Sequence, residues 1–190
     1  ILCTGLFLLA CEKKNTATEI IYHPHSNFFN DGNLVKVNLT PQASYKEIYQ
    51  TVARIHRNDS TPFFELQLEN EVIRIMPFAS SHHLSTGIHK ISITEDSVYS
   101  LDSYPIDSLR SALTKFYGRK KIPEIYRQSP EHILEIDLHM EMTGEDLENK
   151  LKDIREIFDE INATQNDSLD LKITLSYFRH LPLPLPPSNN

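Results

Sequence analysis

The chain has 190 residues, of which 26 are acidic and 19 are basic, and its net charge is −7 at neutral pH. This charge repels phosphate backbones and no long basic stripe offsets it, so we exclude nucleic acid as an expected partner. With five glycines in all, the sequence has no phosphate-binding loop or dinucleotide fingerprint, and it contains no Gly-x-Ser-x-Gly nucleophile elbow.

The first ten residues are uncharged and almost all apolar or small, as in the apolar core of an export signal. They are too few for a transmembrane helix, which needs about 20 residues. Leu8, Leu9, Ala10 and Cys11 resemble a bacterial lipobox, whose cysteine thiol accepts diacylglycerol. We therefore predict that residues 1–10 are a lipoprotein signal that lacks its first residues, and that Cys11 is lipidated. An ordinary cysteine beside a packed apolar run is the alternative.

Removal of the signal would also remove Cys3, so we expect no intrachain disulfide. Lipid on Cys11 would hold the protein at a membrane outside the cytoplasm. Glu12 follows the cysteine, where the usual signal for retention at the inner membrane has aspartate. We therefore expect the protein to be located in the cell envelope, anchored to the outer membrane on its periplasmic or its surface face.

Residues 11–30 are polar and lack periodicity, which predicts a tether between the lipid and one folded domain at residues 31–180. Residues 181–190 contain four prolines, which forbid a helix and favour polyproline II. We interpret this Pro-rich tail as an inert extended segment, with a role as the ligand of a partner as the alternative.

In the first half of the domain, apolar residues alternate along a strand over positions 35–39, and Ser44 then opens a helix through a capping box with Glu47. Two further runs, residues 64–68 and 72–78, predict a hairpin that ends at Pro77. This half is therefore β-α-β-β. The buried face of its helix is predicted to hold Ile48, Val52 and Ile55.

In the second half, alternation predicts a hairpin over residues 91–101 and a helix from Asp107 that ends in a left-handed cap at Gly118. A strand over residues 134–140, a long helix capped by Thr143 and a strand over residues 171–177 follow. This half is β-β-α-β-α-β. The whole domain is predicted to be α+β, a mixed sheet with about three amphipathic helices packed on it. The inward residues of the two helices are Leu109, Ala112, Leu113 and Phe116, then Leu147, Leu151, Ile154, Phe158 and Ile161.

A shift of 99 positions superimposes the two segments that consist of a strand, a cap and a helix, and it places Ser44 on Thr143. Such self-similarity indicates either a duplicated unit, with residues 31–80 as one half, or the chance recurrence of a common fragment. The other matching pairs are Val37 and Ile136, Leu39 and Leu138, Ile48 and Leu147, Val52 and Leu151, and Ile55 and Ile154.

Residues 91–116, which read ISITEDSVYSLDSYPIDSLRSALTKF, resemble the opening of the periplasmic domain of the ExbD and TolR family of biopolymer transport proteins. In that family a hairpin leads into an amphipathic helix, and the order of the later elements extends the resemblance to residues 88–180. Ser97 and Ser103 stand where the family usually has glycines. The resemblance implies a module that binds peptidoglycan or an envelope protein but lacks the family's transmembrane motor helix.

A basic loop after the second predicted helix is the best binding candidate, because clustered cations can meet anionic envelope polymers or an acidic partner. A solvated loop is the alternative. Tyr45 and Tyr49 lie off the apolar face of the first helix, so they are either exposed contact residues or residues packed against the other half. The candidate binding residues are Arg119, Lys120, Lys121 and Arg127.

The histidines are interpreted as surface residues, without a metal or another cofactor, because their spacing does not gather about four ligands. Asp137 and His139 are interpreted as a solvated strand face, with a hydrolase trio completed by a serine as the alternative. We therefore expect a non-enzymatic binding or scaffolding domain that contacts peptidoglycan or an envelope protein, and homodimerisation stays open. The competing hypothesis is a metal-binding protein that uses His23, His25, His82, His83 and His89.

Overall fold

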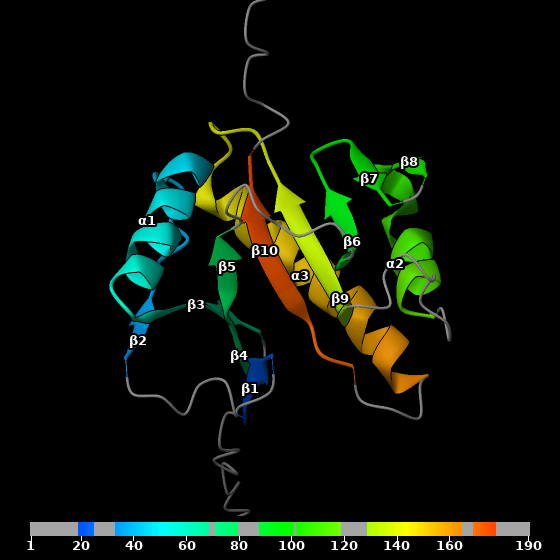
Figure 1. Ribbon diagram of the computed structural model, residues 1–190, viewed down its shortest axis with the longest axis horizontal. Coiled ribbons are helices and arrows are strands. Elements are labelled where there is room, and N and C mark those ends of the chain that lie inside the picture. The colour runs from blue at the N-terminus through cyan, green and yellow to red at the C-terminus, as the bar shows by residue number, and fades with distance from the viewer. Residues whose placement is uncertain are drawn as a thin grey trace, which may run out of the picture.

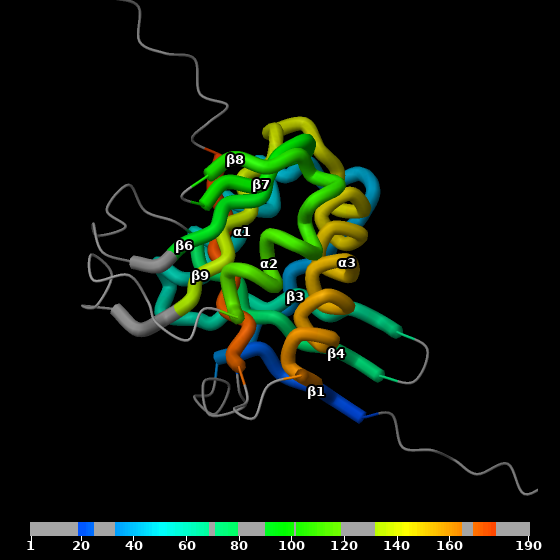
Figure 2. The backbone as a smooth tube through the Cα atoms, turned by 90° about the vertical axis from the view of Figure 1, so that its right-hand side faces the viewer, coloured from blue at the N-terminus to red at the C-terminus, as the bar shows by residue number. Residues whose placement is uncertain are grey.

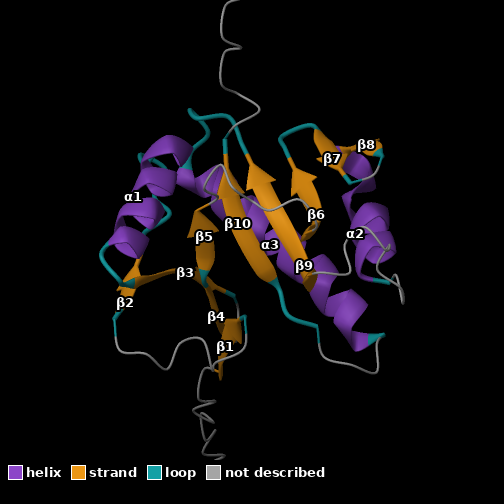
Figure 3. Ribbon diagram, viewed as in Figure 1, coloured by secondary structure: helices purple, strands orange, loops and turns teal. Residues whose placement is uncertain are grey.

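The computed structural model describes residues 19–24, 33–68, 71–79, 88–100, 102–118, 129–164 and 169–177. The predicted α+β class is confirmed. Within the described residues the α-helices are α1 (Tyr45–Arg57), α2 (Leu109–Tyr117) and α3 (Gly144–Ala163), and the strands form two mixed sheets (Figure 3).

The larger sheet has six strands in the order β5-β10-β9-β6-β7-β8. Strands β5, β10, β9 and β6 run parallel, and β7 and β8 continue the sheet in antiparallel pairs. Helices α2 and α3 cover one face of this sheet, whereas α1 lies beside its β5 edge (Figures 1 and 2). The strands are β5 (Pro77–Ala79), β6 (Ile88–Ile93), β7 (Ser97–Tyr99), β8 (Ser103–Pro105), β9 (Ser129–Asp137) and β10 (Lys172–Ser176).

The smaller sheet has the order β1-β4-β3-β2, and it contains the predicted hairpin as the antiparallel pair β3 and β4. Strand β1 lies inside the segment that we expected to be an irregular tether, and that expectation is wrong for these residues. β1 is an edge strand held by parallel backbone pairing with β4, so its residues show no alternation that sequence patterns could detect. The strands are β1 (Glu19–His23), β2 (Leu34–Lys36), β3 (Thr61–Gln67) and β4 (Glu71–Ile75).

Pro77 does not end the β structure, contrary to the prediction. β4 stops at Ile75, and the chain then passes into the other sheet, where β5 begins at Pro77 and pairs in parallel with β10. Proline is tolerated there because β5 is an edge strand, and the missing N–H removes no bond from the interior of the sheet. The hairpin predicted over residues 64–78 is thus split between two sheets.

Two further details around α2 differ from the prediction. A short 3-10 turn, Ile106–Ser108, precedes α2, and β8 forms from residues that we read as a loop. Gly118 has φ −74°, so it is not in the left-handed conformation. Instead its N–H donates to the Thr114 carbonyl at 2.8 Å, which extends the helical turn.

The helices α1 and α3 begin as predicted. Ser44 and Thr143 each accept a hydrogen bond from the N3 backbone, and the N3 carboxylates of Glu47 and Asp146 bond back to the cap. These bonds satisfy helix N–H groups that have no partner within the helix. The inward residues predicted for all three helices are buried in one core that both sheets share.

Candidate functional site

The residues predicted as sites from the sequence fall mainly outside the described part of the chain. These are the lipidation candidate Cys11, the Pro-rich tail, the basic loop residues Arg119, Lys120, Lys121 and Arg127, and His25, His82 and His83. Their assignments therefore stay predictions.

His23 is not a surface residue. Only 5% of it is exposed, and its ring packs edge-to-face against Phe158 of α3 at a centroid distance of 5.8 Å. Asp137 is also buried, so our expectation that it lies on a solvated strand face is wrong. His139 is exposed and lies beyond the end of β9, in the turn that leads to α3, so strand alternation does not reach it.

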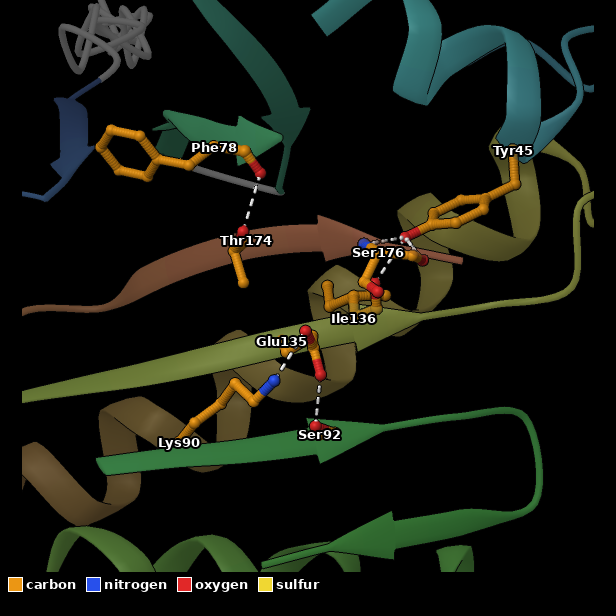
Figure 4. A network of polar contacts seen from close by, with 8 residues as sticks. All are labelled: Tyr45, Phe78, Lys90, Ser92, Glu135, Ile136, Thr174 and Ser176. Carbon is orange, nitrogen blue, oxygen red and sulfur yellow. Dashed lines mark hydrogen bonds and ion pairs between the residues drawn. The ribbon is translucent and has the colours of Figure 1, made fainter. Parts of the chain in front are cut away.

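The buried carboxylates belong to a polar face of the six-stranded sheet. Strand pairing places Thr174, Glu135 and Ser92 in one row across β10, β9 and β6, and all three are buried (Figure 4). The residues that alternate with them pack into the helix-covered core. This sheet therefore has one apolar face and one polar face, and burial of the polar face requires hydrogen-bond partners.

Glu135 has two such partners, and both lie on the neighbouring strand β6. The Lys90 ammonium lies 2.9 Å from one carboxylate oxygen, and the Ser92 hydroxyl donates to the other at 2.5 Å. Thr174 donates to the Phe78 carbonyl at 3.1 Å, which joins β10 to β5. These bonds stabilise a buried charge and tie neighbouring strands together, so we assign this network a structural role.

Tyr45 joins α1 to the ends of two central strands. Its hydroxyl lies 2.5 Å from the Ile136 carbonyl oxygen and 2.9 Å from that of Ser176, and it accepts the Ser176 N–H at 3.3 Å (Figure 4). Burial raises the pKa of this phenol well above its usual range. Tyr45 is therefore a packing residue, as one of our two interpretations held, and not an exposed contact.

A solvent-facing hollow lies between α1 and β5, and we call it the α1–β5 groove. It has a volume of about 530 Å³, and its walls include Tyr49, Gln50, His56 and Arg57 of α1 and Phe78 of β5. Phe78 is 41% exposed, although it is a large apolar residue. Its ring stacks on the His56 imidazole with an interplanar angle of 5°, at a centroid distance of 5.8 Å.

The polar groups of the groove are held in place by the same elements. The His56 Nε2 atom lies 3.0 Å from the Pro77 carbonyl oxygen, which fixes the ring against β5. Tyr49 packs edge-to-face against Tyr177 at 4.6 Å, so its aromatic body is fixed at the other end. Gln50 is exposed beside these rings. The groove thus combines aromatic surfaces with hydrogen-bond donors at its rim, a composition that is typical of concave ligand-binding sites.

Sequence reasoning missed this groove because the groove exists only where β5 lies beside α1. We placed Phe78 at the end of a hairpin and interpreted the histidines, which include His56, as surface residues. An aromatic residue directly after Pro77 was the available signal, but periodicity does not say which element faces it.

No protein-family model, no curated protein and no solved structure matches this chain. Among the described residues, no helix combines the length and the apolar composition that crossing a bilayer requires. Within the same residues, no three histidine, cysteine, aspartate or glutamate side chains are grouped so that they could hold a metal ion.

Proposed function

We propose that this chain is a non-enzymatic lipoprotein of the bacterial envelope, held at a membrane through lipid on Cys11, and that its α+β domain binds an extended polypeptide of an envelope protein in the α1–β5 groove. The observation that carries the binding proposal is the exposed Phe78 ring. This ring stays 41% exposed in a groove beside ordered polar groups, and its burial by a ligand would be favourable because it removes apolar surface from water.

Charge supports a polypeptide with acidic or carbonyl-rich character as the ligand. The chain is acidic overall, yet the second half of α1 presents Arg54 and Arg57 near the groove. Arginine side chains at the rim can donate several hydrogen bonds to carboxylates or backbone carbonyls.

The order of elements also supports a binding module. From β6 to β10 the order follows the one that the resemblance to the ExbD and TolR periplasmic domain implies, with β8 and a 3-10 turn added. That resemblance stays a prediction, as do the outer-membrane location and the binding role of the basic loop.

The test is crosslinking in native cells, followed by identification of the captured proteins, with the full chain and two matched variants. Arg57→Gln removes a cation from the groove, and Lys46→Gln removes an exposed cation of the same helix that does not line it. We expect capture of an envelope protein to fall at least several-fold in Arg57→Gln and to persist in Lys46→Gln.

The anchor and the alternative ligand need separate arms. Cys11→Ala should release the protein from membranes and reduce capture, because the lipid confines it near its partner. If the protein sediments with purified peptidoglycan and this depends on Arg57, the ligand of the groove is a glycan polymer and not a polypeptide. Equal capture by Arg57→Gln and Lys46→Gln would refute the groove as the binding surface. In a separate metal analysis, stoichiometric zinc in untagged protein would favour the metal-binding hypothesis.

A further inference from the structure

We propose that the α1–β5 groove accepts a polyproline II ligand, and that this ligand is residues 181–187 of the same molecule. The inference rests on the proposed function, since it names the class of polypeptide that the groove binds. It also assigns a role to the Pro-rich tail, which we had interpreted as inert.

The composition of this segment suits such a groove. Residues 181–187 read LPLPLPP, so every face of a polyproline II helix with three residues per turn would be apolar. Proline lacks an N–H, and the polyproline II conformation makes no internal hydrogen bonds, so the carbonyl groups remain available as acceptors. A suitable site therefore offers flat apolar rings and hydrogen-bond donors.

The α1–β5 groove offers both. Tyr49 and Phe78 supply the aromatic surfaces, and Gln50 and Arg57 supply side-chain donors at the rim. Aromatic-lined grooves are the usual receptors of Pro-rich segments, because the ligand is already extended and loses little conformational entropy on binding. The segment carries no charge of its own, so this recognition depends on rings and carbonyl groups and not on ion pairs.

The last described residue before the segment, Tyr177, lies at one end of the groove. Tyr177 follows β10 directly, and its ring contacts Tyr49. Leu181 is four residues further on, and a fully extended chain of four residues reaches at most about 13 Å. Tyr49 and Arg57 are eight residues apart on α1, or about 12 Å along the helix axis, which about four residues of polyproline II can span.

Attachment to the domain makes even weak binding effective. A short flexible link raises the local concentration of the segment into the millimolar range, so a site with a Kd of about 1 mM is about half occupied and one with a Kd of about 0.1 mM is largely occupied. An external polypeptide would then have to displace the segment before it could bind in the groove.

The experiment is paramagnetic relaxation in NMR spectra of the full chain. A spin label is attached at Ser188→Cys in a background in which Cys3 and Cys11 are alanine, and line broadening is measured at Ala53 and Ala79, which line the groove, and at Ala112 of α2. We expect strong broadening at Ala53 and Ala79, independent of protein concentration, and little at Ala112. Replacement of both Leu183 and Leu185 by aspartate should abolish it.

Two matched variants test the aromatic contact. Phe78→Ala removes a side chain that is 41% exposed in the groove, whereas Val35→Ala removes one that is 39% exposed on β2. We expect the broadening at Ala53 to be lost in the first and kept in the second. No broadening at the groove, or equal broadening in both variants, overturns the inference.

The outcomes separate this inference from the proposed function. If Ala53 and Ala79 show no broadening while envelope capture still depends on Arg57, the groove binds an external polypeptide and only the inference fails. If the broadening is present but capture is insensitive to Arg57, the segment occupies the groove and the proposed function fails. Broadening that increases with protein concentration would assign the ligand to a second molecule and would also overturn the inference.

Discussion

Ser44 and Thr143 lie opposite each other in an isolated antiparallel bridge, although 99 positions separate them. Two backbone hydrogen bonds flank the bridge: the Tyr45 N–H donates to the Met142 carbonyl at 2.6 Å, and the Gly144 N–H donates to the Ala43 carbonyl at 2.8 Å. A shift of 99 positions converts each bond into the other. The two helix caps are therefore related by an approximate local two-fold axis.

The elements around the bridge repeat the same arrangement. In one unit, β2 leads through α1 to the parallel strand β3, and in the other, β9 leads through α3 to the parallel strand β10. This recurrence supports the interpretation that residues 31–80 and part of the second half are related units. The equivalent residues Tyr45 and Gly144 nevertheless differ, and each is suited to its own side of the contact.

Gly144→Ala should destabilise the protein, because the two units approach too closely for a side chain. A Cβ atom at this position would lie 2.5 Å from the Thr40 carbonyl oxygen and 2.9 Å from the Leu39 carbonyl carbon, which are backbone atoms. We expect a loss of about 1–3 kcal/mol in the free energy of unfolding, measured by urea denaturation. Asn149→Ala, on the exposed surface of the same helix, should change it by less than about 0.5 kcal/mol.

Tyr45→Phe should cost about 1–3 kcal/mol, because it leaves buried backbone groups of Ile136 and Ser176 without the hydroxyl. Chemical denaturation measures this loss. Tyr104→Phe is the control, since the Tyr104 hydroxyl bonds only to exposed side chains among the contacts described. Equal stability of the two variants would contradict the role of Tyr45 as the contact that joins α1 to β9 and β10.

Lys90→Met should destabilise the protein by about 1–3 kcal/mol, because it removes one partner of the buried Glu135 carboxylate. Lys152→Met provides the comparison, because Lys152 pairs with Glu148 on the surface of α3 at 2.7 Å. Surface pairs contribute at most about 1 kcal/mol. A double variant that also replaces Glu135 by glutamine should lose less stability than the sum of its single replacements, and additivity would argue against the pair.

His132 should make stability depend on pH. Its ring stands among Phe116 and Tyr117, and burial lowers the pKa of the imidazole, partly opposed by a backbone hydrogen bond with Phe116. Since the folded pKa lies below the unfolded value of about 6.5, the unfolded state binds the proton first as the pH falls. The stability contributed by neutral His132 is therefore complete above about pH 6.5 and decreases below it until the folded pKa is reached.

His132→Phe keeps an aromatic ring in this cluster and removes the titration. Thermal unfolding between about pH 7.5 and 5.5 should show a smaller loss of Tm in this variant than in the original chain. His139→Gln removes an exposed imidazole and should leave the original pH dependence in place. If Tm falls with pH as steeply in His132→Phe as in the original chain, His132 is not the source of the pH dependence.

Local structure could be predicted from the sequence wherever the stabilising contacts join residues that are close neighbours along the chain. The capping boxes at Ser44 and Thr143 need only residues three positions away, and the buried helix faces follow from the 3.6-residue period. The antiparallel hairpins of β3 with β4 and β6 with β7 were predictable for the same reason, since short turns join them.

The places where distant segments meet could not be predicted from local patterns and depend on the tertiary structure. Edge strand β1 exists because β4 offers it backbone partners, β5 changes sheet at Pro77, and the α1–β5 groove appears where that strand lies beside α1. The polar face of β9 is buried although its alternation is that of a solvated strand. Pairing between distant strands depends on backbone groups that every residue carries, so the amino-acid pattern of one segment does not specify its partner.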